Sequence, residues 1–175
     1  MNQRIIEKSF DRINRLLNIH PDEYLLVDST SQGLFHIVNN SIRHHYMVST
    51  GRNGIGNRDG SNQTPPGIHR IVEKIGADAP EGTIFRDRLN TGEIWHHGLT
   101  EENLILSRIL RLKGLEDGVN VGPGIDTYER YIYIHGTNQE MLIGTPISHG
   151  CICMKNSDII ALFDMIEEDT LVVID

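Results

Sequence analysis

The chain begins with a stretch in which apolar residues recur every three or four positions, the spacing of one helix face. In residues 4–17, charged residues of both signs separate four apolar side chains with this spacing, Ile6, Phe10, Ile13 and Leu17. We therefore expect an amphipathic helix that packs on the rest of the protein. The uninterrupted apolar core of a secretory signal, about 7–15 residues, is missing, which favours a cytoplasmic protein. A chain trimmed from an exported precursor would instead belong in the periplasm.

After residue 23 the pattern changes to short apolar or β-branched runs separated by turn residues, which is typical of β-strands. Strands are expected at residues 24–28, 34–38, 42–50, 68–75, 83–89, 104–112, 130–135 and 171–174. The run at 104–112 contains Leu and Arg residues that also suit a helix. Two glycine-rich stretches, 51–67 and 114–124, are expected to be loops, and a loop as long as the first is usually functional or mobile.

A second helix is expected near the end of the chain, where Asn156 or Ser157 can cap it. Its inward face would carry four apolar side chains, Ile159, Ile160, Phe163 and Ile166. With about seven or eight strands, two helices and no β-α-β alternation, the sequence predicts a mainly β, largely antiparallel fold. No repeat or linker divides the chain, so we predict one domain, residues 24–175, with the helix of residues 1–23 packed on it.

Composition and charge narrow the class of protein. With 175 residues, of which 38% are hydrophobic and 23% charged, the chain is long enough to bury a core as one globular domain. A net charge of −8 without a basic block argues against nucleic-acid binding. No apolar run reaches the ~18–20 residues of a membrane span, so we expect no membrane partner. The two cysteines cannot build a disulfide framework, and each is expected to be a thiol.

The densest group of chemically active residues lies in YIYIHGTNQEMLIGTPISHGCICM, residues 131–154. His135 ends a predicted strand, and Cys151 directly follows Gly150. A cysteine attacks as its thiolate, and a nearby imidazole can remove its proton. Gly150 permits a tight turn whose backbone N–H groups can face a developing oxyanion. The pattern therefore indicates a cysteine acyl-transfer site.

Two other interpretations of these residues remain open from spacing alone. A free cysteine is often a small buried side chain without a chemical role. His135, His149 and Cys151 are also possible zinc ligands, although HEXXH and paired CXXC motifs are both missing from the sequence. We expect no metal and no other cofactor.

The combination of HGT at residues 135–137 with SHGC at residues 148–151 resembles the signature of L,D-transpeptidases, the YkuD-type catalytic domain. Upstream, VSTGRNGIGNRDGSNQTPPGIHRI is similar to the family's strand, glycine loop and TPxG segment. The blocks NLILSRILRLKGLEDGVN and DTYERYIYIHGTN resemble its next segments. The resemblance covers residues 24–175 and implies a β-sandwich, here with an N-terminal helix and a short C-terminal helix.

The resemblance also implies a reaction. Cys151 would attack the bond between the L-centre of diaminopimelate and D-Ala in a peptidoglycan tetrapeptide or muropeptide, forming a thioester and releasing D-Ala. His135 would act as the base, oriented by the backbone carbonyl of Gly136. Backbone N–H groups of His149, Gly150 and Cys151 would form the oxyanion hole. Carbapenem β-lactams would acylate the same sulfur.

Substrate contacts follow from the same resemblance. We expect Tyr133, Trp95 and the turn residue Ser148 to line the substrate site. A mobile lid is expected within residues 92–104, where packing is the alternative role for its aromatic residues. This segment contains Trp95, His96 and His97.

One position departs from the family pattern. Many members carry Arg or Asn two residues after the nucleophile, whereas this chain has Cys153. A thiol cannot supply the charged fork with which Arg binds carboxylates, so substrate positioning at this point is expected to differ. We expect Cys153 neither to act as a second nucleophile nor to form a disulfide with Cys151, because a two-residue separation rarely permits unstrained geometry.

The thioester can pass to water or to an amine. Because recycled tetrapeptides lie in the cytoplasm, we expect hydrolysis, which would make the protein an L,D-carboxypeptidase of peptidoglycan recycling. The alternatives are an L,D-transpeptidase that forms 3-3 cross-links and an inactive peptidoglycan-binding module.

Overall fold

The computed structural model describes residues 3–96, 98, 100 and 102–175. Within these residues the chain forms two α-helices, α1 (Gln3–Leu17) and α2 (Asn156–Met165), and a 3-10 helix, η1 (Glu140–Leu142). The strands are β1 (Glu23–Asp28), β2 (Gly33–Val38), β3 (Ser41–Ser49), β4 (Gly67–Ile75), β5 (Thr83–Arg86), β6 (Leu89–Ile94), β7 (Ile105–Gly114), β8 (Tyr133–Gly136), β9 (Ile152–Met154) and β10 (Leu171–Ile174). The predicted mainly β class with two helices is confirmed, with ten strands in place of seven or eight.

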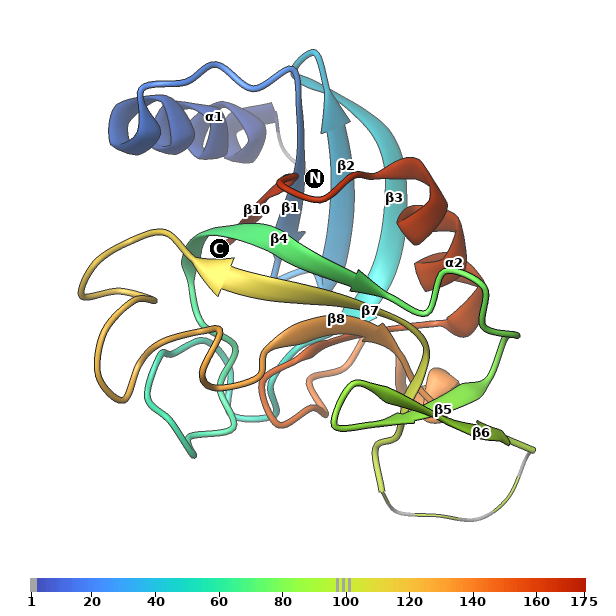
Figure 1. Ribbon diagram of the computed structural model, residues 1–175. Helices are drawn as coiled ribbons and strands as arrows, with labels where there is room; N and C mark the ends of the chain where they lie inside the picture. The colour runs from blue at the N-terminus through green and yellow to red at the C-terminus, as the bar shows by residue number, and fades with distance from the viewer. Residues whose placement is uncertain (1–2, 97, 99, 101) are drawn as a thin grey trace.

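The strands form one sheet in the order β4-β10-β1-β2-β3-β9-β8-β7-β5-β6. An additional pairing of β4 with β7 joins distant parts of this order, so every strand except β5 and β6 belongs to a closed ring. The pairs β1–β10 and β8–β9 are parallel, and the other strand pairs are antiparallel. In Figure 1 the β5–β6 hairpin projects from the lower side of the ring. Closure leaves the ring with an inner face and an outer face.

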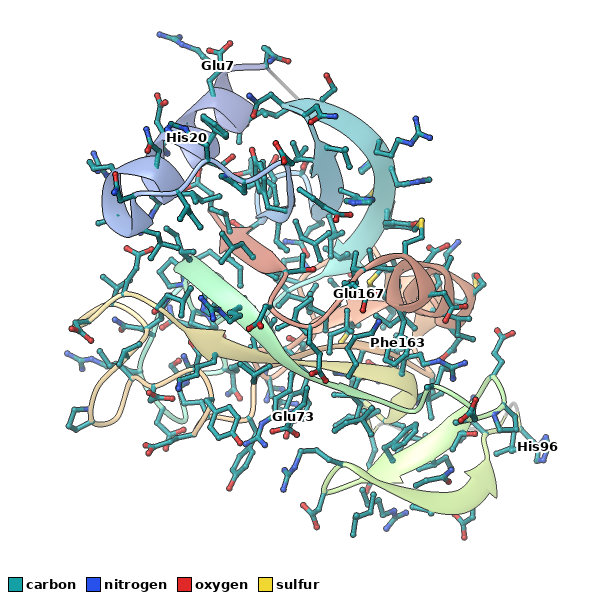
Figure 2. All side chains as sticks on the ribbon, turned by 45° about the horizontal axis from the view of Figure 1, so that its top comes forward. Glu7, His20, Glu73, His96, Phe163 and Glu167 are labelled. Atoms are coloured by element: carbon teal, nitrogen blue, oxygen red, sulfur yellow. The ribbon has the colours of Figure 1, made fainter. Side chains whose placement is uncertain are left out.

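The inner face of the ring holds the main hydrophobic core. Every strand of the ring contributes to it, because alternate residues of a strand point to the same side. Three buried side chains of α2, Ile159, Leu162 and Phe163, complete this core, and Ile166, directly after the helix, also packs in it. Figure 2 shows Phe163 on the side of α2 that faces the strands. Leu162 takes the inward position that the sequence assigned to Ile160, which is only partly buried.

Helix α1 packs on the outer face of the ring, as its apolar spacing predicts. Ile6 and Ile13 are buried against side chains of β1, β2, β4 and β10. Figure 1 shows α1 beside β1. The Tyr24 hydroxyl contacts the Ser9 hydroxyl at 2.9 Å and donates to the Ile6 carbonyl at 3.2 Å. No helix in the described part of the chain is long and apolar enough to cross a membrane.

The prediction of a single strand at residues 83–89 is wrong, because this segment contains a hairpin turn between β5 and β6. The chain turns at Asp87 and Arg88, whose φ angles are 48° and 68°, and returns as β6. Arg86 pairs with Leu89, so the two residues between them form a two-residue hairpin turn. Such turns usually contain Asn or Gly, which tolerate positive φ, and their absence here hid the turn.

Strand β8 begins later than the sequence predicts. Tyr131 has a φ of 55° and lies in a turn, so extended structure starts at Tyr133. Strand β9 was not predicted at all, because its three residues are too few for an alternating pattern. Together, β8 and β9 carry the residues that the sequence marked as chemically active.

Candidate active site

Strands β8 and β9 bring the predicted nucleophile and base to one side of the ring. They are parallel neighbours in which His135 pairs with Cys153. Cys151 lies two residues before Cys153, and it packs in a small cluster with Tyr133, which precedes His135 by two residues. Residues two apart in a strand share a face, so both thiols and the imidazole lie on the outer face of the ring. Cys153 is opposite His135, and Cys151 is diagonal to it.

The imidazole of His135 is buried and held at both nitrogens. Its Nδ1 lies 2.8 Å from the carbonyl oxygen of Gly136, so Nδ1 carries the proton and donates it. This leaves Nε2 as the acceptor. Burial lowers the pKa of His135 to about 4, against a smaller raising effect of the Gly136 carbonyl. The imidazole is therefore neutral at neutral pH, the state that a general base requires.

Cys151 is a partly buried residue whose sulfur contacts two backbone groups. The backbone N–H of Tyr133 donates to it at 3.4 Å, and its thiol reaches the Tyr131 carbonyl at 3.5 Å. Burial raises the pKa of Cys151 to about 11, although the Tyr133 N–H and the positive charge of Arg130 both oppose this shift. Cys151 is therefore a neutral thiol at rest, and attack requires a base to remove its proton.

The sulfur of Cys153 is the direct neighbour of the imidazole. Its Sγ lies 3.8 Å from Nε2 of His135, while Asn103 Nδ2 donates to the same sulfur at 3.3 Å. Cys153 is fully buried, and this burial raises its pKa to about 12. Of the two cysteines, Cys151 is partly exposed and Cys153 is buried. Among the hydrogen bonds of the described residues, the imidazole contacts Cys153, and the expected contact with Cys151 is not one of them.

The turn before Cys151 is held by its own side chains and by a distant loop. The Ser148 hydroxyl donates to the Cys151 carbonyl at 2.6 Å and accepts the Gly150 N–H at 3.0 Å. Thr64, in the TPxG segment, donates its hydroxyl to the Gly150 carbonyl at 2.8 Å and accepts the Gly51 N–H at the same distance. Ser148 therefore shapes the turn, and the loop of residues 51–67 positions it.

This arrangement changes the predicted oxyanion hole. The Gly150 N–H is already committed to Ser148, which leaves the N–H groups of His149 and Cys151 as candidate donors. Gly150 itself has a φ of 128°, and a Cβ at this position would lie 3.0 Å from the Gln63 carbonyl oxygen and from Ile132 Cδ1. Only glycine fits this turn without strain.

The aromatic residues expected to form a lid lie apart from Cys151 where the structure describes them. Trp95 lines a cavity of about 510 Å³ together with Glu81, Thr137, Glu140 and Met141, beside β8 rather than at Cys151. His96 is exposed and lies on the outer side of the hairpin (Figure 2). His97 lies outside the described residues. No group of three or more His, Cys, Asp or Glu side chains in the described ranges could hold a metal ion.

Sequence reasoning missed three residues that shape the site. Arg130 donates to the carbonyls of Asn57 at 2.9 Å and Gln63 at 2.7 Å, which ties the glycine-rich loop to the chain entering β8. Asn103 bridges Cys153 to the Thr137 hydroxyl, which donates to Asn103 Oδ1 at 2.7 Å. The third residue is Arg88, which donates to the Tyr133 hydroxyl at 3.1 Å. Asn103 and Arg130 lie in blocks that resemble the family's segments, but only the tertiary structure shows which groups these residues contact.

The chain is similar to a known protein family and to one of its curated members. A family model for the L,D-transpeptidase catalytic domain, YkuD, matches residues 22–174. Over 153 residues the chain is 27% identical to the Bacillus subtilis (strain 168) protein named "Putative L,D-transpeptidase YqjB", covering 87% of this chain and 71% of that protein.

Solved structures show the same fold. An L,D-transpeptidase from Mycobacterium smegmatis superimposes with a TM-score of 0.57 at 13% identity, covering 88% of this chain and 58% of that one. The C442S mutant of the Enterococcus faecium L,D-transpeptidase gives 0.54 at 18% identity, covering 89% and 50%. LdtMt1 in complex with imipenem gives 0.54 at 15%, covering 88% and 59%. The chain thus spans between half and three-fifths of these solved chains.

Proposed function

Because this chain belongs to the L,D-transpeptidase catalytic-domain family, we propose that it is a cysteine acyl-transfer enzyme of peptidoglycan metabolism. Its substrate would be a murein tetrapeptide, cleaved between the L-centre of diaminopimelate and D-Ala. The observation that carries this proposal is that a partly exposed thiol, Cys151, and a neutral buried imidazole lie on the same face of neighbouring segments. An inactive binding module would not require either group to be held in this way.

The acylation step follows from the protonation states. Sγ of Cys151 attacks the carbonyl carbon of the L-centre while its proton passes to Nε2 of His135, since Nδ1 keeps its own proton on the Gly136 carbonyl. The tetrahedral oxyanion would accept hydrogen bonds from the backbone N–H groups of His149 and Cys151. When the carbon–nitrogen bond breaks, the imidazolium returns the proton to the leaving nitrogen, and D-Ala departs as its free amine.

Hydrolysis would complete the reaction. Water, deprotonated by His135, attacks the thioester carbonyl, the carbon–sulfur bond breaks and the proton returns to Cys151, giving a tripeptide acid. We take this L,D-carboxypeptidase reaction as the primary proposal because it needs no second peptide.

Transfer to an amine is the second candidate, and the cavity beside β8 favours it. Glu81 and Glu140 are among its lining residues, and Trp95 supplies an aromatic surface. Carboxylates and an aromatic face both attract a substrate ammonium group. An acceptor stem held there would attack the thioester and form a cross-link.

Mass spectrometry after incubation with a muropeptide tetrapeptide separates these outcomes. Hydrolysis predicts loss of one D-Ala and accumulation of tripeptide, whereas transpeptidation predicts a peptide dimer. The Cys151→Ala variant is the matched control. If the wild-type protein releases no D-Ala from either a free or a sugar-linked tetrapeptide, the proposed function is wrong.

A further inference from the structure

The β5–β6 hairpin places a positive charge against Tyr131 and Tyr133, the two residues whose backbones contact the nucleophile. Its two-residue turn consists of Asp87 and Arg88, both with positive φ, a conformation that residues with a side chain seldom adopt. Arg88 Nη1 donates to the Tyr133 hydroxyl at 3.1 Å, and its guanidinium carbon lies 5.0 Å from the ring centroid of Tyr131. The turn therefore holds this side chain over two residues that border the candidate active site.

Both tyrosines contact Cys151 through their backbones. The Tyr133 N–H and the Tyr131 carbonyl are the two partners of the Cys151 sulfur. Phe85, on β5 of the same hairpin, packs with Tyr133 and Cys151 in one cluster. The hairpin that carries Arg88 thus covers the outer face of the sheet next to the nucleophile.

Unlike Arg111, Arg88 forms no ion pair with a carboxylate in the described part of the chain. Arg111, which also lies near Tyr131, forms an ion pair with Glu73 at 2.8 Å. Arg130 donates to backbone carbonyls of the glycine-rich loop. Among the ion pairs of the described residues, none includes Arg88. Its side chain is half-buried, so a ligand can reach the guanidinium.

We infer that Arg88 binds the terminal carboxylate of the residue that leaves, and so selects substrates that end one residue after the scissile bond. This inference rests on the proposed function. In a tetrapeptide, only the leaving nitrogen and one α-carbon separate the scissile carbonyl from that carboxylate, so a cation held at Tyr131 and Tyr133, which contact Cys151, is suitably placed. A guanidinium binds a carboxylate through two parallel hydrogen bonds. Arg88 would thereby supply, from another element, the fork that Cys153 cannot provide.

The test compares kcat/KM for two substrates in variants of two arginines, Arg88 and Arg86. One substrate is the tetrapeptide with its free terminal carboxylate, and the other carries a primary amide at that position. Arg88→Gln should lower kcat/KM for the free acid about 10- to 100-fold, chiefly through KM, and leave the amide unchanged. Arg86→Gln is the matched control, because Arg86 is an exposed arginine on the same hairpin. An equal loss on both substrates, or no loss on the free acid, would overturn the inference.

A binding experiment separates this inference from the proposed function. Calorimetric titration of Cys151→Ala with the same two peptides reports affinity without turnover. The free acid should bind more tightly than the amide, and adding Arg88→Gln should abolish this difference. If D-Ala is never released but the difference is present and lost with Arg88→Gln, only the proposed reaction fails. If D-Ala is released and no difference exists, only the role of Arg88 fails.

Discussion

Nε2 of His135 lies 3.8 Å from the sulfur of the buried Cys153, and the partly exposed Cys151 is the diagonal neighbour. The strand register explains this relationship, because parallel pairing sets His135 directly opposite Cys153. Cys153 thus lies between the imidazole and Asn103, a residue of the segment between β6 and β7. Its contribution should be to hold the imidazole rather than to attack the substrate.

The two thiols should therefore respond differently to substitution. Cys151→Ala should abolish D-Ala release while leaving the fold intact, because the side chain is only partly buried. Cys153→Ser should retain most activity, within about tenfold of wild type, since a hydroxyl can still contact Asn103 and His135. Release of D-Ala measured by mass spectrometry checks both. Activity that survives in Cys151→Ala and disappears in Cys153→Ser would reverse the assignment.

Acylation by a carbapenem should reveal the protonation state of the base. The adduct should form on Cys151, and its rate constant should stay level from pH 7 to pH 5 and fall only toward pH 4, because His135 with a pKa of about 4 remains neutral above that value. An imidazole with the ordinary pKa of about 6.5 would slow the reaction more than about tenfold at pH 5. Time-resolved mass spectrometry of the adduct gives the rate.

The same experiment tests whether His135 is the base at all. The pKa of Cys151 is raised to about 11, so the thiolate fraction falls about tenfold with each pH unit below that value. A rate that follows this decline through the whole range would mean that pre-formed thiolate attacks without help from the imidazole.

Two buried neutral histidines should make the protein sensitive to mild acid. His69 contacts the Gly67 carbonyl and the Thr127 hydroxyl, each at 3.1 Å, and burial lowers its pKa to about 4, as for His135. Because both folded-state pKa values lie below the unfolded value, this stability is fully present above about pH 6.5 and is lost as the pH falls toward 4. Each histidine contributes up to about 3 kcal/mol.

Urea unfolding at pH 7 and pH 5 measures this linkage. The free energy of unfolding should fall between the two values, and His69→Gln should reduce the fall by about half, since one of the two titrating groups is removed. A wild-type unfolding free energy that is the same at both pH values would contradict the neutral state of these imidazoles.

Replacing Gly150 should damage both stability and activity. Gly150→Ala places a Cβ against the Gln63 carbonyl oxygen and Ile132 at a φ of 128°, and we expect a loss of about 1–3 kcal/mol together with most turnover. Gly118→Ala is the matched control, because Gly118 also has a positive φ, 72°, but nothing lies within 4 Å of its added Cβ. Thermal unfolding and D-Ala release distinguish the two variants. Equal losses would show that backbone strain alone, and not contact at the turn, is responsible.

Much of the fold could be read from local patterns. Helix α1 and strands β1, β2, β4 and β10 were predicted nearly to their ends because an amphipathic period is a property of a few consecutive residues. The pattern also located β7, although Arg108 interrupts its alternation. The structure explains the interruption: Ser107 has a φ of 66° and the register shifts between Leu106 and Ile109, so a bulge changes which side chains face inward.

By itself, the sequence determined which chemical groups the protein has and where they occur along the chain, since His135, Gly150 and Cys151 stand out by residue type and spacing. The tertiary structure alone decided how these groups meet. Which sulfur faces the imidazole depends on the register of two strands whose residues are far apart in sequence. That Arg88 reaches Tyr133 depends on a hairpin folding over the sheet. Contacts of this kind arise when separate segments pack together, and no local pattern encodes them.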